Sequence, residues 1–165
     1  MDAAPVWTPA YIGLGSNLDD PPRQLRAALD GLARLPSSRL IAVSPFYLSR
    51  PVGPQDQPDF VNAVAALLTR LDGEALHREL QSLERALGKR PPAVRFGPRR
   101  IDLDLLVFGA ERIASAALEV PHPRLHERAF VLYPLADLAP ALWIPGRGRT
   151  AALRAAVAGD APTPV

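Results

Sequence analysis

Four short apolar segments, rich in Val, Ile, Leu and aromatic residues, punctuate the chain at residues 7–14, 40–48, 60–69 and 101–108. Segments of this length and composition are typical of β-strands. Pro45 interrupts the second segment, and a proline in a strand marks an edge or a bulge because it cannot donate a ladder hydrogen bond. The pattern therefore predicts four strands, with an irregularity in the second.

Leucines at intervals of three and four residues predict helices between these strands. The first helix begins near Pro21, a residue that suits the first helical turn, and the second ends at Gly88, a residue typical of helix C-termini. Two more helices are expected at residues 127–138 and 150–158. The order β-α-β-β-α-β predicts an α+β domain in which helices pack on a mostly antiparallel sheet.

Three other segments are rich in Gly and Pro. The sequence GLGS at residues 13–16 lacks the lysine of a P-loop and the spacing of a dinucleotide fingerprint, so we expect a structural turn there. Residues 49–58 and 89–98 predict long irregular loops. The second of these loops combines basic residues with little apolar surface, which is typical of a weakly packed segment.

Composition narrows the class of protein. Hydrophobic residues make up 48% of the chain and charged residues 22%, which suits one folded domain over residues 1–165. The absence of cysteine excludes disulfides and thiolate chemistry. A net charge of +2 gives little reason to expect a nucleic-acid partner. No apolar run is long enough to cross a membrane, and residues 1–9 lack a signal-peptide pattern, so a cytoplasmic protein is expected.

The assembly and the chain ends can also be predicted. We expect a monomer, because no apolar helix stripe is left over after the core is assigned. We expect residues 1–6 and 159–165 to fray, because neither end carries a packed apolar pattern.

The most informative polar residues are Asp102 and Asp104 in the last predicted strand. Alternate side chains of a strand share a face, so these carboxylates point the same way, with Cα atoms roughly 6.5 Å apart. Ile101, Leu103 and Leu105 then point into the core on the other face. Two carboxylates converging from one strand can hold a pair of hard cations, which in two-metal sites lie roughly 3.5–4 Å apart.

A solvated strand face with two acids is the simpler interpretation of a D-x-D pair alone. Two observations favour the metal site. The like charges of Asp102 and Asp104 repel, so the pair needs a compensating cation. Arg95, Arg99 and Arg100 lie just upstream. An acid pair beside a basic loop is what a magnesium–polyphosphate complex requires, because magnesium completes its shell with phosphate oxygens while arginines neutralise the rest.

The segment that holds these residues, FGPRRIDLD at 96–104, resembles the signature of the 6-hydroxymethyl-7,8-dihydropterin pyrophosphokinase family. Four further motifs of that family match in the same order: YIGLGSN at 11–17, GPQDQPDFVN at 53–62, VPHP at 120–123 and RAF at 128–130. The resemblance runs from about residue 10 to residue 143. It implies a ferredoxin-like α/β sandwich with long catalytic loops. It also implies transfer of a diphosphate from ATP to the hydroxymethyl group of the reduced pterin, in folate biosynthesis.

The resemblance further implies roles for individual residues. Two magnesium ions would be held by Asp102 and Asp104. The catalytic residues would be these two acids together with Lys89 and Arg99. Contacts to ATP would come from Gln81, Arg95, His122 and Arg128. The pterin pocket would be formed by Ser49, Val52, Phe60, Asn62 and Phe130. Apart from the resemblance, the basic and weakly packed composition of residues 89–98 predicts a lid, mobile in the free protein and ordered when ATP and pterin are both bound.

Each of these residues also has a structural interpretation. Phe60 and Phe130 are each typical core residues, and His122 between two prolines could cap a turn. Gln81 and Arg128 could be ordinary helix-surface residues. Asn62 discriminates between the two interpretations of its strand, because a buried amide needs hydrogen-bond partners that a flat heterocycle supplies.

The chain departs from the family pattern at several positions. Lys89 stands where the first base of an Arg-x-Arg pair is frequent, and Pro91 stands in place of the second. Phe96 replaces a frequent Trp, and Pro123 replaces a Tyr that often follows the histidine. These departures leave open whether Arg90 or Arg95 replaces the base that is missing at Pro91, and the residues alone indicate no general base.

Two other functions are consistent with parts of the pattern. An RNA-binding module of the same fold class would need a basic sheet face with surface aromatics, against which the acid pair argues. A degenerate relative that binds pterin without turnover gains weight from the changes at Lys89 and Pro91.

Overall fold

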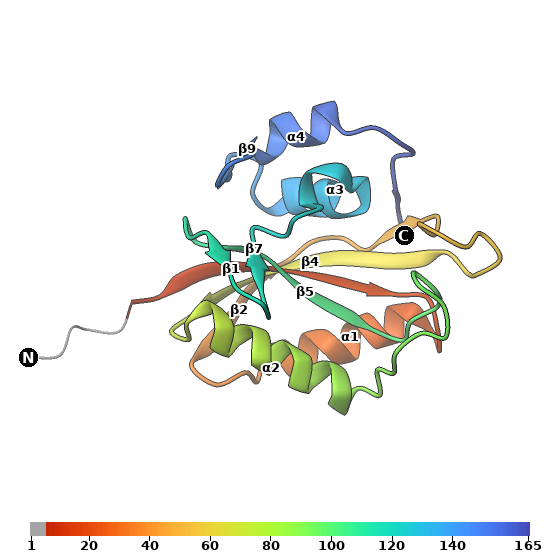
Figure 1. Ribbon diagram of the computed structural model, residues 1–165, viewed down its shortest axis with the longest axis horizontal. Coiled ribbons are helices and arrows are strands. Elements are labelled where there is room, and N and C mark those ends of the chain that lie inside the picture. The colour runs from red at the N-terminus through yellow and green to blue at the C-terminus, as the bar shows by residue number, and fades with distance from the viewer. Residues whose placement is uncertain (1–5) are drawn as a thin grey trace, which may run out of the picture.

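The computed structural model describes residues 6–165, which form a main sheet with helices on both faces (Figure 1). In chain order the elements are β1 (Thr8–Ser16), α1 (Pro21–Leu32), β2 (Ser38–Val43), β3 (Tyr47–Ser49), β4 (Phe60–Thr69), α2 (Gly73–Ala86), β5 (Asp102–Phe108), β6 (Ile113–Ala114), β7 (Glu119–Val120), η1 (Leu125–Glu127), α3 (Ala129–Leu138), β8 (Trp143–Ile144), β9 (Gly148–Arg149), α4 (Thr150–Ala156) and β10 (Thr163–Pro164). None of the helices in this described part is long and apolar enough to span a membrane.

The main sheet has six strands in the order β10-β3-β4-β1-β5, with β2 also pairing with β4. All of its neighbouring strands run antiparallel. Two small hairpins, β6–β7 and β8–β9, lie outside it. The predicted α+β class, antiparallel sheet and sandwich of sheet and helices are confirmed.

The two faces of the sheet pack against different helices. Figure 1 shows α1 and α2 against one face and α3 against the other, with α4 packed on the side of α3 that faces away from the sheet. Leu103 and Leu105 of β5 belong to the core under α1 and α2, whereas Val64 and Leu106 belong to the core under α3. The period-two alternation of the strands therefore separates two apolar layers.

Two local predictions were inaccurate. The predicted second strand is divided into β2 and β3, because the segment around Pro45 leaves the ladder there. The turn predicted at residues 13–16 is wrong, since β1 runs through Ser16. Gly15 pairs with both Asn62 and Asp102 across the sheet. Close packing accounts for the glycine, because a Cβ atom at Gly15 would lie 3.0 Å from Asn62 Oδ1.

The C-terminal segment is a correction as well. We expected residues 159–165 to fray, yet Thr163–Pro164 pairs with β3 as strand β10. The N–H of Val165 donates to the carbonyl of Phe46 at 2.9 Å, and Pro162 is buried. The segment is ordered because it covers the outer edge of the short strand β3. Of the N-terminal residues expected to fray, 1–5 lie outside the described part of the chain.

Candidate functional site

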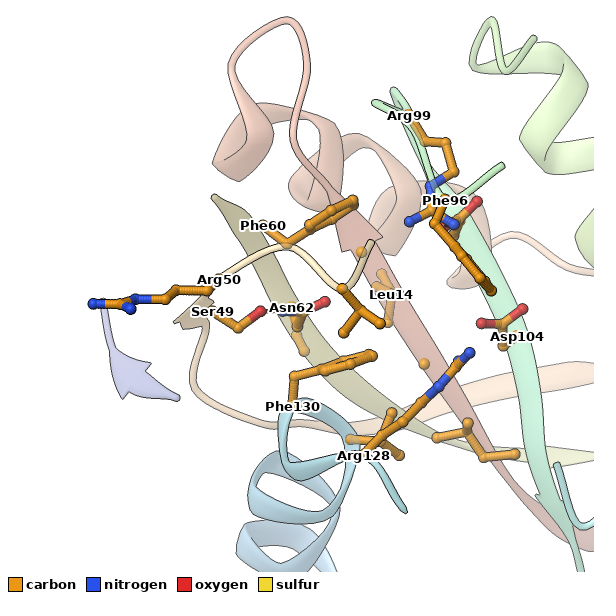
Figure 2. A pocket seen from close by; sticks show the side chains of 17 residues that line it. Leu14, Ser49, Arg50, Phe60, Asn62, Phe96, Arg99, Asp104, Arg128 and Phe130 are labelled. Carbon is orange, nitrogen blue, oxygen red and sulfur yellow. Dashed lines mark hydrogen bonds and ion pairs between the residues drawn. The ribbon is translucent and has the colours of Figure 1, made fainter. Parts of the chain in front are cut away.

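A pocket opens on the α3 side of the sheet, between the loop after β3 and the start of α3 (Figure 2). It encloses about 700 Å³, including open solvent at its mouth. Gly13 and Gly15 of the central strand β1 lie at its base, where the missing side chains leave room for a ligand.

Asp102 and Asp104 both line this pocket from β5, as the alternation predicts. They lie opposite Gly15 and Gly13 in the pairing with β1. Leu103, between them, is 4% exposed on the opposite face. One strand therefore supplies a core residue and two site residues.

Asp102 is compensated by two cations. Lys89 Nζ lies 2.9 Å from Asp102 Oδ1, and Arg99 Nη1 lies 3.1 Å from Asp102 Oδ2. Lys89 also donates to Glu84 Oε2 at 2.8 Å. Burial lowers the pKa of the Lys89 amine, but Asp102 and Glu84 outweigh this effect and raise it above its ordinary value.

Glu84 is a site residue that the sequence patterns missed. It is 8% exposed on α2, and its carboxylate also accepts the backbone N–H of Leu103 at 2.8 Å. Burial raises the pKa of Glu84, although the hydrogen bond from Lys89 opposes the shift. An available signal was its position four residues after Leu80, on the core-facing side of the helix.

Asp104 differs from Asp102, because no Lys, Arg or His within residues 6–165 lies at ion-pair distance from its carboxylate. Burial raises the pKa of Asp104, and the charge of Asp102 raises it further. His122 and Arg128 oppose that shift from nearby. Burial lowers the pKa of His122 in turn, against the influence of Asp104. Asp102 is already ion-paired and Asp104 is not. Asp104 is therefore the carboxylate of this pair that can accept a further cation.

The residues expected to bind pterin lie together. Figure 2 shows the rings of Phe60 and Phe130 on either side of Asn62. Asn62 is 5% exposed, and its Nδ2 donates to Ser49 Oγ at 2.6 Å. Val52 lines the same pocket from the loop after β3 and is 55% exposed.

The residues expected to bind ATP are more scattered. Arg128 lines the pocket and points toward Asp104 (Figure 2). His122 accepts the backbone N–H of Arg124 at Nδ1, 3.2 Å away. Arg95 is exposed on the loop before β5, and Gln81 is exposed on α2. Of these four residues only Arg128 belongs to the pocket lining, so the structure does not bring Gln81, Arg95 or His122 into the pocket with it.

Two further residues fix the loop of residues 89–98. Asn17 Oδ1 accepts the backbone N–H of Arg99 at 2.8 Å, and Asn17 Nδ2 donates to Gln57 Oε1 at 3.0 Å. Gln57 Nε2 donates to the carbonyl of Phe96 at 2.8 Å. Phe96 has a φ of 59° and lines the pocket. The end of the loop near β5 is thus anchored, whereas Val94 and Arg95 are exposed.

Within residues 6–165, no cluster of three or more His, Asp or Glu side chains gathers in a way that could hold a metal. A cation at Asp102 and Asp104 therefore needs other ligands, such as phosphate oxygens and water.

The comparison with known proteins decides the family. The family model for 7,8-dihydro-6-hydroxymethylpterin-pyrophosphokinase (HPPK) matches residues 11–140. The chain belongs to the HPPK family. It is 54% identical over 135 residues to the 2-amino-4-hydroxy-6-hydroxymethyldihydropteridine pyrophosphokinase of Pseudomonas aeruginosa, covering 82% of this chain and 83% of that protein. The protein of the same name from Haemophilus influenzae is 47% identical over 136 residues, with coverage of 82% and 84%.

Solved HPPK structures show the same fold. The wild-type Plasmodium falciparum HPPK-DHPS with pteroate matches with a TM-score of 0.70, at 12% identity. The match covers 94% of this chain and 43% of that longer one. This likeness concerns the fold, and it confirms the arrangement of sheet and helices in an HPPK domain.

Proposed function

We propose that this chain transfers a diphosphate from ATP to the hydroxymethyl group of 6-hydroxymethyl-7,8-dihydropterin, releasing AMP. The observation that carries the proposal is the single pocket in which an acid pair and basic residues adjoin two aromatic rings and a buried amide. The charged end suits a magnesium–triphosphate complex, and the aromatic end suits a flat heterocycle. The hydroxyl of the acceptor then lies between them.

Two magnesium ions fit the charged end. Asp102 and Asp104 supply oxygen ligands from one strand face, and the small number of protein ligands suits an ion that keeps water and phosphate in its shell. Magnesium held by Asp102 and Asp104 would neutralise phosphate charge and would ease the loss of the proton from the pterin hydroxyl. The partly buried and unpaired Asp104 supports this assignment, because desolvation and the charge of Asp102 both raise its pKa and a bound cation would oppose both effects.

Lys89 and Arg99 act on the transferring group in this proposal. Their ion pairs with Asp102, at 2.9 and 3.1 Å, support this role, because a triphosphate held at Asp102 would lie within reach of both side chains. Their charges stabilise the transition state more than the ground state, because negative charge spreads over the transferring oxygens as the bond to AMP breaks. Arg95, His122, Arg128 and the more distant Gln81 contact ATP.

At the other end, Phe60 and Phe130 stack on the pterin. Asn62 donates to Ser49 with one of its two amide hydrogens, which leaves the second hydrogen and a carbonyl lone pair for the heterocycle edge. Ser49 and Val52 complete the wall. Closure of the 89–98 loop over both ligands excludes water. Lid motion, a monomeric state and a cytoplasmic location stay predictions.

A pterin-binding protein without turnover is the alternative, favoured by the proline at position 91 in place of a second loop base. Incubation with ATP, magnesium and the pterin, followed by chromatography, separates the two functions. We expect AMP to accumulate in proportion to the pterin supplied and to be absent without pterin. Pterin binding by calorimetry with no AMP above the enzyme-free rate would refute diphosphate transfer and support the alternative.

A further inference from the structure

Two arginines share one aromatic ring at the rim of the pocket. Arg95 Cζ lies 4.8 Å from the centroid of the Phe96 ring, and Arg124 Cζ lies 5.5 Å from the same centroid. Arg95 belongs to the loop before β5, whereas Arg124 follows β7 and precedes η1. The ring thus joins two segments that are distant in sequence. It also holds two positive charges close together.

This pair is not neutralised by the protein. Within residues 6–165, no carboxylate lies at ion-pair distance from Arg95, Arg124 or Arg128. Lys89 and Arg99, by contrast, are already paired with acids. The charge of Arg124 reaches the site, since it is among the causes that lower the pKa of Arg128 and of His122, after burial. Three arginines without an ion-pair partner among the described residues therefore lie around this end of the pocket, where an anion can bind them, while Asp59, Glu127 and Asp160 line the adjoining groove.

The backbone at Arg124 is also tied to the site. Its N–H donates to His122 Nδ1 at 3.2 Å. Its exposed side chain lines a broad groove that adjoins the pocket and shares Arg128 and Phe130 with it. The backbone of Arg124 is thus held by His122 while its guanidinium faces the groove, where it can meet a ligand.

We propose that Arg124 is a further binding residue for the polyphosphate of ATP, acting together with Arg95 across Phe96. This role rests on the proposed function. It adds a specific residue to that function, because Arg124 would supply the positive charge that is missing at Pro91. Planar guanidinium groups match phosphate oxygens in bidentate geometry. Stacking on Phe96 restricts both side chains, so less rotamer freedom is lost when the phosphates bind.

Binding measurements on the full chain test this role. The probes are a non-hydrolysable ATP analogue with a methylene bridge between the α- and β-phosphates, and AMP. We expect Arg124→Gln to weaken binding of the analogue about five- to tenfold, as one charge-assisted contact at a partly exposed site suggests. Binding of AMP and of the pterin should stay within about twofold. Arg124→Lys should recover part of the lost affinity for the analogue, because lysine keeps the positive charge but lacks the bidentate guanidinium group.

Arg147→Gln is the matched control, because Arg147 is an exposed arginine between β8 and β9, outside the pocket and groove. An equal effect of Arg147→Gln would reduce the result to net charge and overturn the proposal. Equal weakening of analogue and AMP, or weakened pterin binding alone, would show that Arg124 only supports Phe96. These measurements need no turnover. A wild-type chain that forms no AMP would therefore refute the proposed function while the result for Arg124 stands.

Discussion

The two faces of the sheet follow the same alternation and differ in what covers them. On one face, α1 and α2 seal Leu103 and Leu105 into a continuous core. On the other, α3 covers Leu106 and leaves the end of β5 that carries Asp102 and Asp104 to the pocket. Neighbouring residues of one strand thus serve stability and chemistry separately. Substitutions at neighbouring positions of β5 should therefore have different effects: those on the pocket face should lower turnover, and those on the core face should lower the free energy of unfolding.

The largest effect is expected from Asp104→Asn. Removing this carboxylate takes away a metal ligand, so AMP formation should fall at least about 10³-fold. The free energy of unfolding of the ligand-free protein should be unchanged or higher, because the repulsion with Asp102 and the cost of burying a charge both disappear. Urea denaturation and product chromatography measure the two quantities. Full activity of this variant with magnesium would contradict the two-metal assignment.

On the opposite face, Leu103→Ala should lower the free energy of unfolding by about 2–5 kcal/mol, the usual cost of truncating a fully packed leucine. The turnover of the molecules that stay folded should fall far less than in the Asp104 variant. Denaturant titration and kcat well below the unfolding temperature provide the test. If Leu103→Ala removed turnover without destabilising the fold, the separation of the two faces would fail.

Lys89→Ala should lower kcat by about 10²-fold while weakening ATP binding less than tenfold, because its charge matters most in the transition state. Arg99→Ala should behave alike. Lys89 is the only lysine in the chain, so reductive methylation with a ¹³C reagent labels this side chain and the chain's α-amine alone. The NMR signal of Lys89 should shift when ATP and magnesium are added. Equal losses in kcat and ATP affinity would mean that Lys89 binds the ground state.

Asn62→Ala tests the aromatic end of the pocket. Loss of the paired hydrogen bonds should weaken pterin binding by about 1–3 kcal/mol and leave ATP binding nearly unchanged. Ser49→Ala should weaken pterin binding less than Asn62→Ala does, since it removes only the hydroxyl that accepts from the Asn62 amide and orients it. Calorimetry with each ligand separately gives the comparison. Equal weakening of pterin and ATP would show that Asn62 acts through the fold.

The smallest effect concerns the contact between the sheet and α3. Tyr47 donates its hydroxyl to Asp137, and burial together with this bond raises the pKa of Tyr47 to about 12. A raised pKa means that this stabilisation is fully present below pH 10 and is lost as the pH rises from 10 toward 12. The free energy of unfolding of the wild-type chain should exceed that of Tyr47→Phe by about 1 kcal/mol at pH 8, and this difference should decrease above pH 10. Urea titrations from pH 8 to 11 with a constant gap would contradict this account.

Local patterns predicted what depends on local geometry. The alternation in β5 placed Asp102 and Asp104 together, since it needs no information from the rest of the chain. Gly13 and Gly15 were misread as a turn, because a glycine in a central strand is explained only by the neighbours that approach it. Glu84 was missed for a similar reason, because a charged helix residue is ordinarily exposed and only the fold brings Lys89 and Leu103 to it.

The same reasoning explains the chain end. Strand β10 forms because β3 leaves an edge open, and nothing within residues 159–165 predicts that pairing. The anchoring of Phe96 by Gln57 is equally non-local, because the two residues come from different loops. Contacts between loops are set by the sheet that positions them, and short sequence windows cannot contain that information.

The most direct test of the central claim is one phosphorus NMR experiment with ATP, magnesium and 6-hydroxymethyl-7,8-dihydropterin. The account predicts that AMP and the pterin diphosphate form together in equal amounts with the wild-type chain, and that neither forms with Asp104→Asn. ADP or inorganic phosphate as the main product, or equal rates for the two chains, would contradict diphosphate transfer at this acid pair.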